Sequence, residues 1–172
     1  MRDWERLLRL RYSTCFIRSR PRRSFMSRIA VAGRILVAAQ FALLAWLVWP
    51  LTPQTWSLPA LALLTCSVAL GLWTLAHNRL GNFNIRPEPK ASGRLVTSGP
   101  YRFMRNPMYS ALLVFAFAEV VAYDDPWKIL CWLALALVLL AKAVLEERGL
   151  RAQHTGYDEY ARRVRRFIPG VF

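Results

Sequence analysis

The chain has 172 residues, enough for one domain, and combines 55% hydrophobic residues with a formal net charge of +14. A soluble protein rarely carries both features, whereas a membrane protein does when apolar residues form spans and cations flank them. Of the 24 Lys and Arg residues, 21 lie in three segments beside apolar stretches: 1–28, 78–107 and 146–172. Cations placed in this way indicate contact with membrane lipids and argue against nucleic acid as a partner.

The first 28 residues form a basic segment with a partly regular pattern. Trp4, Leu8, Tyr12 and Phe16 recur every four residues, which fits an amphipathic helix on the inner membrane surface. A disordered basic tail explains the same composition, and the sequence does not decide between the two. The segment is too long for the basic region of a signal peptide, and no convincing cleavage site follows it.

Four apolar stretches follow, and crossing a bilayer takes about 20 residues in a helix. We predict membrane spans at 29–49, 58–77, 107–123 and 127–145. The third has the shortest uncharged core, because Glu119 interrupts it. All three basic segments fall on one side of this four-span arrangement. The positive-inside rule therefore predicts a multi-pass protein with both termini in the cytoplasm.

The predicted fold class is all-α integral membrane, with a single domain at 29–172 after the basic segment. Its cytoplasmic elements, 78–107 and 146–169, are expected to meet at the inner ends of the spans and form a pocket. In the first element, Asn106 is a good N-cap for the third span, and Pro107 suits the first helical position.

The second cytoplasmic element continues the fourth helix past the membrane surface toward Leu150. An amphipathic helix is then expected, because apolar residues follow one another at near-helical spacing with arginines between them. Its apolar residues are Tyr157, Tyr160, Val164 and Phe167, and Pro169 ends it.

Charged residues at the inner end of the fourth span form one candidate site. Lys142 and Glu146 are four residues apart and share a helix face, and Glu147 adds a second carboxylate. In the ordinary interpretation the lysine extends to the lipid head groups and both glutamates face water. In the functional interpretation, these ionisable groups hold a polar ligand.

A second candidate group surrounds the start of the third span: Tyr101, Arg105, Asn106 and Tyr109. Because helix N-termini attract anions, a ligand carboxylate or phosphate fits against the free amides after Asn106, with Arg105 beside it. The tyrosine rings suit a cation. The alternative is that Asn106 only caps the helix, Arg105 meets lipid phosphate and the tyrosines belong to the interfacial aromatic belt.

Other polar residues give weaker signals. Arg34 and Gln40 interrupt the first span, and Arg34 is expected to extend to the head groups. Glu119 marks either a polar path or a position near the outer surface. The three cysteines and two histidines lack ligand spacing, so we predict no disulfide and no metal site.

Three motifs together resemble a known family. They are LVTSGPYRFMRNPMY (Leu95–Tyr109), EERGL (Glu146–Leu150) and YDEYARRVRRFIP (Tyr157–Pro169). Their order and separation resemble the isoprenylcysteine carboxyl methyltransferase family and the related phospholipid N-methyltransferases. The resemblance covers residues 78–172, and it implies an integral membrane enzyme that uses S-adenosylmethionine and methylates a lipophilic small molecule or lipid.

The resemblance also implies roles for individual residues. It assigns catalytic roles to Lys142, which would face the acceptor, to Glu146 and to Arg105. Glu146 would also complete the cofactor site, whose other members are Arg94, Leu95, Val96, Tyr101, Asn106, Pro107, Met108 and Tyr109.

Two positions depart from the family pattern, and they keep other functions open. Asn106 replaces the usual histidine and cannot titrate, and Lys142 replaces the usual arginine and lacks its planar fork. The methyl acceptor, whether carboxylate, amine, thiol or hydroxyl, is therefore not specified. The alternatives are a membrane NADPH-dependent reductase similar to sterol reductases, and a non-catalytic membrane protein that retains the fold.

Overall fold

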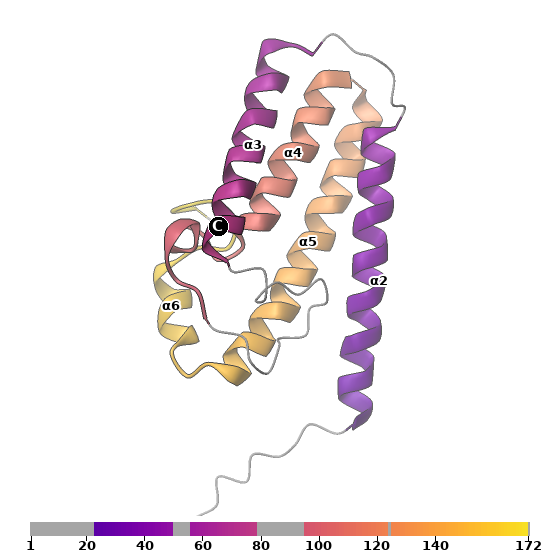
Figure 1. The fold of residues 1–172 in the computed structure, drawn as a ribbon. Coiled ribbons are helices and arrows are strands. Elements are labelled where there is room, and N and C mark those ends of the chain that lie inside the picture. Colours follow the sequence, from indigo (N-terminus) through magenta and orange to yellow (C-terminus); the bar gives the residue numbers. More distant parts are fainter. Residues whose placement is uncertain (1–22, 50–55, 79–94, 124, 172) are drawn as a thin grey trace, which may run out of the picture.

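The computed structural model describes residues 23–49, 56–78, 95–123 and 125–171. The basic segment 1–22 and the cofactor candidate Arg94 lie outside these ranges. The described residues form five α-helices and one 3-10 turn, with no β-strand (Figure 1). In chain order these elements are α2 (Arg23–Val48), α3 (Leu58–His77), η2 (Gly99–Arg102), α4 (Pro107–Tyr123), α5 (Pro126–Gln153) and α6 (Tyr157–Arg163).

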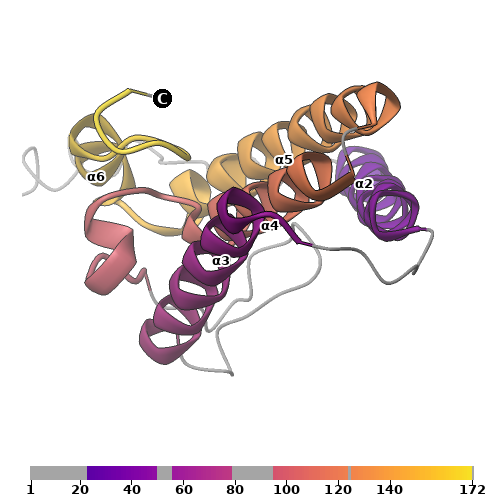
Figure 2. The same ribbon diagram turned by 90° about the horizontal axis from the view of Figure 1, so that it is seen from above.

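The four long helices run alternately up and down side by side. Helix α4 packs between α3 and α5, and α2 packs mainly on α5 (Figures 1 and 2). The end of α3, the start of α4 and the late part of α5 therefore lie at one end of the bundle, together with η2 and α6 (Figure 1). Apolar side chains from α2, α4 and α5 form the core between these helices: Leu47, Ala116, Val120, Cys131, Leu135 and Leu139.

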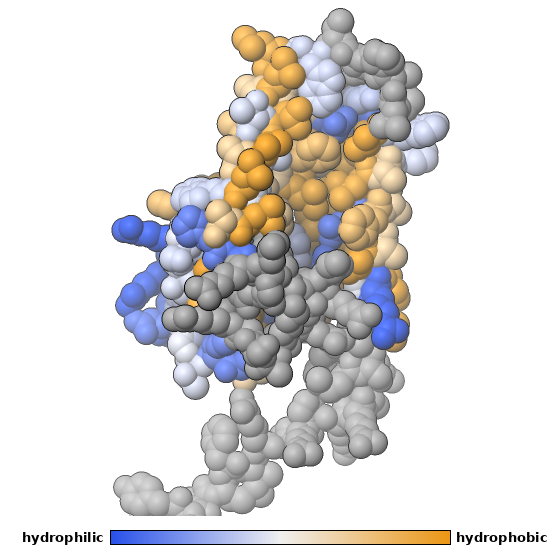
Figure 3. All heavy atoms as spheres, viewed as in Figure 1, coloured by the Kyte–Doolittle hydropathy of each residue, from blue (hydrophilic) through white to orange (hydrophobic). Residues whose placement is uncertain are grey.

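Three helices are long and apolar enough to cross a membrane. They are α2 over Val31–Val48, the whole of α3, and α5. Helix α4 is equally apolar but has only 17 residues. Large hydrophobic side chains face outward on the long helices, as lipid contact requires, among them Ile35, Phe41, Trp46, Leu72 and Leu137. Figure 3 shows this hydrophobic surface over the helices and hydrophilic residues around the end that carries α6.

Local signals in the sequence explain where the helices begin. Ser57 caps α3, because its side-chain oxygen accepts a hydrogen bond from the Ala60 N–H (3.5 Å). Asp125 caps α5 by accepting from the Trp127 N–H (2.9 Å), and Pro126 occupies the first helical position. The bounds of α3 and α4 coincide with the second and third predicted spans.

The first and fourth helices extend beyond their predicted spans, the fourth in the direction expected. Helix α2 starts at Arg23, before the predicted span, and α5 continues to Gln153. At about 1.5 Å per residue, the 28 residues of α5 extend roughly 42 Å, well beyond a hydrocarbon core of about 30 Å. One end of α5 therefore projects past the apolar layer.

The expected C-terminal amphipathic helix is shorter than predicted. Helix α6 ends at Arg163, and the backbone of Val164 is extended. The following residues leave the helix because they pair with the segment before α4: the Arg105 N–H donates to the Arg165 carbonyl (2.7 Å) and the Asn106 N–H to the Arg166 carbonyl (3.0 Å). The prediction of a helix through Phe167 was therefore wrong.

Gly99 allows η2 to lie against the end of α3. Its φ of 60° is a left-handed conformation that side chains with a Cβ rarely adopt. A Cβ at this position would also overlap the ring of His77. The glycine of the GPY motif is therefore explained by backbone conformation and by close approach.

Candidate functional site

The two predicted groups of polar residues meet at the end of the bundle that carries η2 and α6. The Tyr109 hydroxyl, on the first turns of α4, donates to Glu146 Oε1 on α5 (2.5 Å). The ammonium of Lys142 lies 5.1 Å from the centroid of the Tyr109 ring and donates to Gln40 Oε1 on α2 (2.7 Å). We call Gln40, Tyr109, Lys142 and Glu146 the polar cluster.

Lys142 is buried rather than extended toward the head groups. Only 3% of it is exposed, so the ordinary interpretation of this lysine was wrong. A buried ammonium is costly unless polar groups surround it. Here the Gln40 oxygen, the face of Tyr109 and the nearby Glu146 carboxylate supply that environment.

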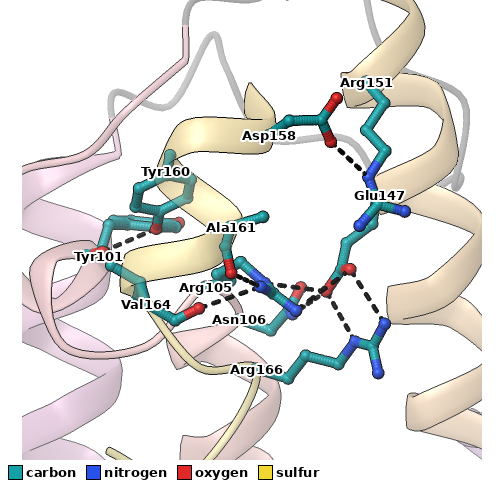
Figure 4. Close-up of polar contacts among 10 residues, drawn as sticks. All are labelled: Tyr101, Arg105, Asn106, Glu147, Arg151, Asp158, Tyr160, Ala161, Val164 and Arg166. Carbon is teal, nitrogen blue, oxygen red and sulfur yellow. Dashed lines mark hydrogen bonds and ion pairs between the residues drawn. The ribbon is translucent and has the colours of Figure 1, made fainter. Parts of the chain in front are cut away.

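Tyr101 lies on η2 and belongs to the same neighbourhood. Burial raises the pKa of its hydroxyl to about 12, a hydrogen bond with the Asn78 side chain opposes the shift, and the Glu146 charge adds to it. Tyr101 is therefore neutral at physiological pH. The Tyr160 hydroxyl on α6 donates to the Tyr101 carbonyl (2.7 Å), which ties η2 to the C-terminal segment (Figure 4).

Glu147 forms a separate network beside the polar cluster. It is 1% exposed, and both carboxylate oxygens accept from Arg105 (3.2 and 3.3 Å) and from Arg166 (3.0 and 3.3 Å), as Figure 4 shows. The interpretation that both glutamates face water was therefore wrong for Glu147. Such paired, charge-assisted hydrogen bonds are strong and geometrically specific.

Arg105 uses most of its donors within this network. Besides Glu147, its Nη1 atom donates to the Ala161 carbonyl (2.6 Å) and to the Val164 carbonyl (3.0 Å). Its predicted catalytic role stays a prediction. These contacts instead favour a structural role in which Arg105 joins α5 to the C-terminal segment.

Asn106 was expected to cap α4 with its side-chain oxygen, but it contacts the start of the helix through its backbone carbonyl. Its backbone carbonyl accepts from the N–H groups of Tyr109 (3.0 Å) and Ser110 (3.1 Å). Its side-chain amide donates to Glu147 Oε1 (3.5 Å), and in the described part of the chain it makes no capping hydrogen bond. The Asn106 side chain therefore faces Glu147 rather than Glu146.

The other predicted cofactor residues lie just before η2 or at the start of α4. Leu95 and Val96 are half-buried just before η2, Pro107 is buried at the first position of α4, and Met108 is half-buried beside it. Their predicted role in cofactor binding is not tested by these positions. For metal binding, the described residues contain no group of three or more His, Cys, Asp or Glu side chains with suitable geometry.

Residues 56–155, more than half of the chain, match the sequence profile of the family described as phospholipid methyltransferase. The chain belongs to the phospholipid methyltransferase family. This confirms the resemblance noted from the motifs. The match includes Tyr101, Tyr109, Lys142 and Glu146, whereas Gln40 lies outside it.

A curated relative matches part of the same region. It is the cobalt-zinc-cadmium resistance protein CzcN of Cupriavidus metallidurans, which is 35% identical over 82 residues. The alignment covers 46% of this chain and 38% of CzcN. The chain therefore spans well under half of the length of that relative.

Sequence reasoning missed two residues that organise this end of the bundle, Gln40 and Arg166, and did not predict the partners of Glu147. Gln40 appeared only as a polar interruption of the first span, yet it accepts from Lys142. Glu147 and Arg166 pair across 19 positions of sequence, and no short motif joins them. A polar amide inside an apolar helix was the available signal for Gln40, because such a group needs a partner in the membrane.

Proposed function

We propose that the chain is a multi-pass membrane methyltransferase that transfers a methyl group from S-adenosylmethionine to a lipophilic acceptor at the cytoplasmic membrane face. Family membership supports the reaction class. The hydrogen bond between Tyr109 and Glu146 carries the proposal, because it joins the two motifs expected to hold the cofactor.

The chemistry of the polar cluster fits a cationic cofactor. Glu146 is a half-buried carboxylate that accepts a hydrogen bond from the Tyr109 hydroxyl and whose charge acts on the nearby Tyr101. A carboxylate and tyrosine faces both attract a sulfonium. The Met108 N–H, which has no hydrogen bond within the described residues, suits the carboxylate end of the cofactor at the start of α4.

When bound, S-adenosylmethionine supplies an electrophilic methyl group on a sulfonium centre. Glu146 and the two tyrosines bind and orient it, and half-burial of their side chains limits access of water. Lys142, whose ammonium lies over the Tyr109 ring, faces the acceptor. A carboxylate acceptor needs no base, whereas for an amine or hydroxyl acceptor Glu146 is the nearest group able to take a proton.

Four membrane-spanning helices would bring the polar cluster into contact with the bilayer, from which a lipophilic acceptor would enter. Helix α4 spans about 26 Å at 1.5 Å per residue, close to the hydrocarbon thickness of about 30 Å, and we propose that it is the fourth membrane span. The polar cluster then lies near the inner end of the spans. The basic residues around that end support a cytoplasmic location for it under the positive-inside rule.

Cofactor binding by the purified chain tests this function. We expect the wild-type protein to bind S-adenosylmethionine and to transfer label from its labelled methyl group to a component of a membrane extract. Glu146→Gln should lose binding, since the carboxylate charge is removed while the side-chain shape is kept. Glu159→Gln is the matched control, because Glu159 is exposed on α6 and pairs with Arg163.

The outcomes separate the alternative functions. Binding of NADPH in place of S-adenosylmethionine would favour a membrane reductase. Binding of neither cofactor would favour a non-catalytic protein that retains the fold. Unchanged S-adenosylmethionine binding in Glu146→Gln would remove Glu146 from the cofactor site. The chemical class of the labelled product would identify the acceptor.

A further inference from the structure

Lys142 and Glu146 lie one helical turn apart on α5 but do not pair with each other. Opposite charges at this spacing normally attract across the turn. In the described part of the chain no ion pair joins them: Lys142 donates to Gln40, and Glu146 accepts from Tyr109. Each charge therefore has a different partner, supplied by a different helix.

Gln40 is suited to hold the lysine. It is half-buried on α2, within the apolar stretch Val31–Val48, where an amide without a partner is costly. An ammonium has only donors, so the amide oxygen of Gln40 must face it, and this fixes the orientation of the side chain. The Oε1–Nζ distance of 2.7 Å is that of a strong, charge-assisted hydrogen bond.

Tyr109 lies between the two charges. The face of its ring is 5.1 Å from the Lys142 ammonium, and its hydroxyl bonds the Glu146 carboxylate. If Gln40 did not hold Lys142, the flexible lysine stem would allow its ammonium to move toward Glu146. A lysine in contact with Glu146 would compete with any cation for that carboxylate.

We propose that Gln40 is a positioning residue, which holds Lys142 away from Glu146 and so keeps the Glu146 carboxylate available to the cationic cofactor. This inference rests on the proposed function. It assigns a role to α2, which lies outside the segment that matches the family. It also gives Lys142 a fixed direction, toward the seam between α2 and α5, where an acceptor from the bilayer would meet it.

The test uses binding of S-adenosylmethionine, which carries the sulfonium charge, to the full chain in detergent. Gln40→Leu should weaken binding about tenfold, because the freed lysine occupies the carboxylate through a charge-assisted hydrogen bond. Gln40→Glu keeps the acceptor oxygen and should bind within a factor of about two of wild type. The double variant Gln40→Leu/Lys142→Met should bind more tightly than Gln40→Leu, because no lysine remains to compete for the carboxylate.

The double variant separates positioning from a structural role. If Gln40 only supported packing, adding Lys142→Met would leave binding as weak as in Gln40→Leu or weaken it further, and the proposal would be overturned. Equal binding by wild type and Gln40→Leu would overturn it as well. If Gln40→Leu does not fold, Gln40→Asn takes its place, since a shorter amide cannot reach Lys142, and the same expectations apply.

The controls distinguish this inference from the function on which it rests. Failure of the wild-type chain to bind S-adenosylmethionine would refute the proposed function and the role of Gln40 together. Wild-type binding with no effect of the Gln40 variants would refute only the role of Gln40. Thermal unfolding of each variant identifies any loss of binding that comes from loss of fold.

Discussion

Replacing Glu147 by glutamine tests the network that joins α5 to the C-terminal segment. Glutamine keeps the shape and one acceptor oxygen but leaves two arginines without their counter-charge. The side chain of Arg105 is 10% exposed, and that of Arg166 is 28% exposed. Removing one member of a buried ion pair costs about 3–5 kcal/mol. Because Arg166 is partly solvated and one oxygen remains, we expect the free energy of unfolding to fall by about 3 kcal/mol.

The assay is unfolding of the purified chain in detergent, followed by loss of helical circular dichroism. Glu159→Gln is the matched control, since the exposed pair of Glu159 with Arg163 should contribute no more than about 0.5 kcal/mol. Glu146→Gln is a second control one residue away. It should retain most of the stability and lose cofactor binding.

A Glu147→Gln variant as stable as wild type would refute the reasoning, because the arginines would then need no buried counter-charge. Equal losses of stability in Glu146→Gln and Glu147→Gln would also contradict it. That result would mean that the two carboxylates share one role rather than dividing binding and structure between them.

Three further predictions concern other parts of the fold. Gly99→Ala should lower stability by about 1–3 kcal/mol, measured by thermal unfolding, because a Cβ is strained at this φ and overlaps His77. Lys128→Met should lower it by about 1–3 kcal/mol, because the buried ammonium donates to the Leu47 carbonyl (2.5 Å) at the end of α2. Since the folded pKa of Tyr101, about 12, lies above its ordinary value, its contribution to stability is present below pH 10 and is lost as pH rises toward 12. Unfolding measured against pH should show a shallower alkaline decline in Tyr101→Phe.

The positions of the apolar helices follow closely from the sequence. Hydropathy located α3 and α4, and Pro107 marked the first residue of α4 as predicted. Helix α2 begins before the predicted span, since hydropathy marks the membrane-embedded part of a helix and not the point where helical hydrogen bonding begins. The end of α6 was wrong because backbone pairing of Arg165 with Arg105 competes with helix formation, and local spacing does not report that pairing.

The candidate site was predictable only in part. The motifs and helical spacing indicated that Tyr109, Lys142 and Glu146 share one end of the bundle, and the structure brings these three together. Spacing alone did not separate Glu146 from Glu147. Adjacent residues on a helix point about 100° apart, so their surroundings depend on what packs against each face. For Glu147 these partners are Arg105 and Arg166, 42 and 19 positions away in sequence.

The network and the polar cluster depend on each other through the start of α4. Glu147 holds Arg105, and Arg105 is followed directly by the residues that begin α4, so this contact fixes where that helix starts. Tyr109 lies within the first turn of α4, and its hydroxyl reaches Glu146 only if that start is fixed. The C-terminal segment completes the arrangement, because Arg166 holds the other side of the Glu147 carboxylate. The buried ion network of Glu147 therefore supports the geometry of the neighbouring polar cluster, and the two adjacent glutamates of α5 differ in their surroundings because they face different partners.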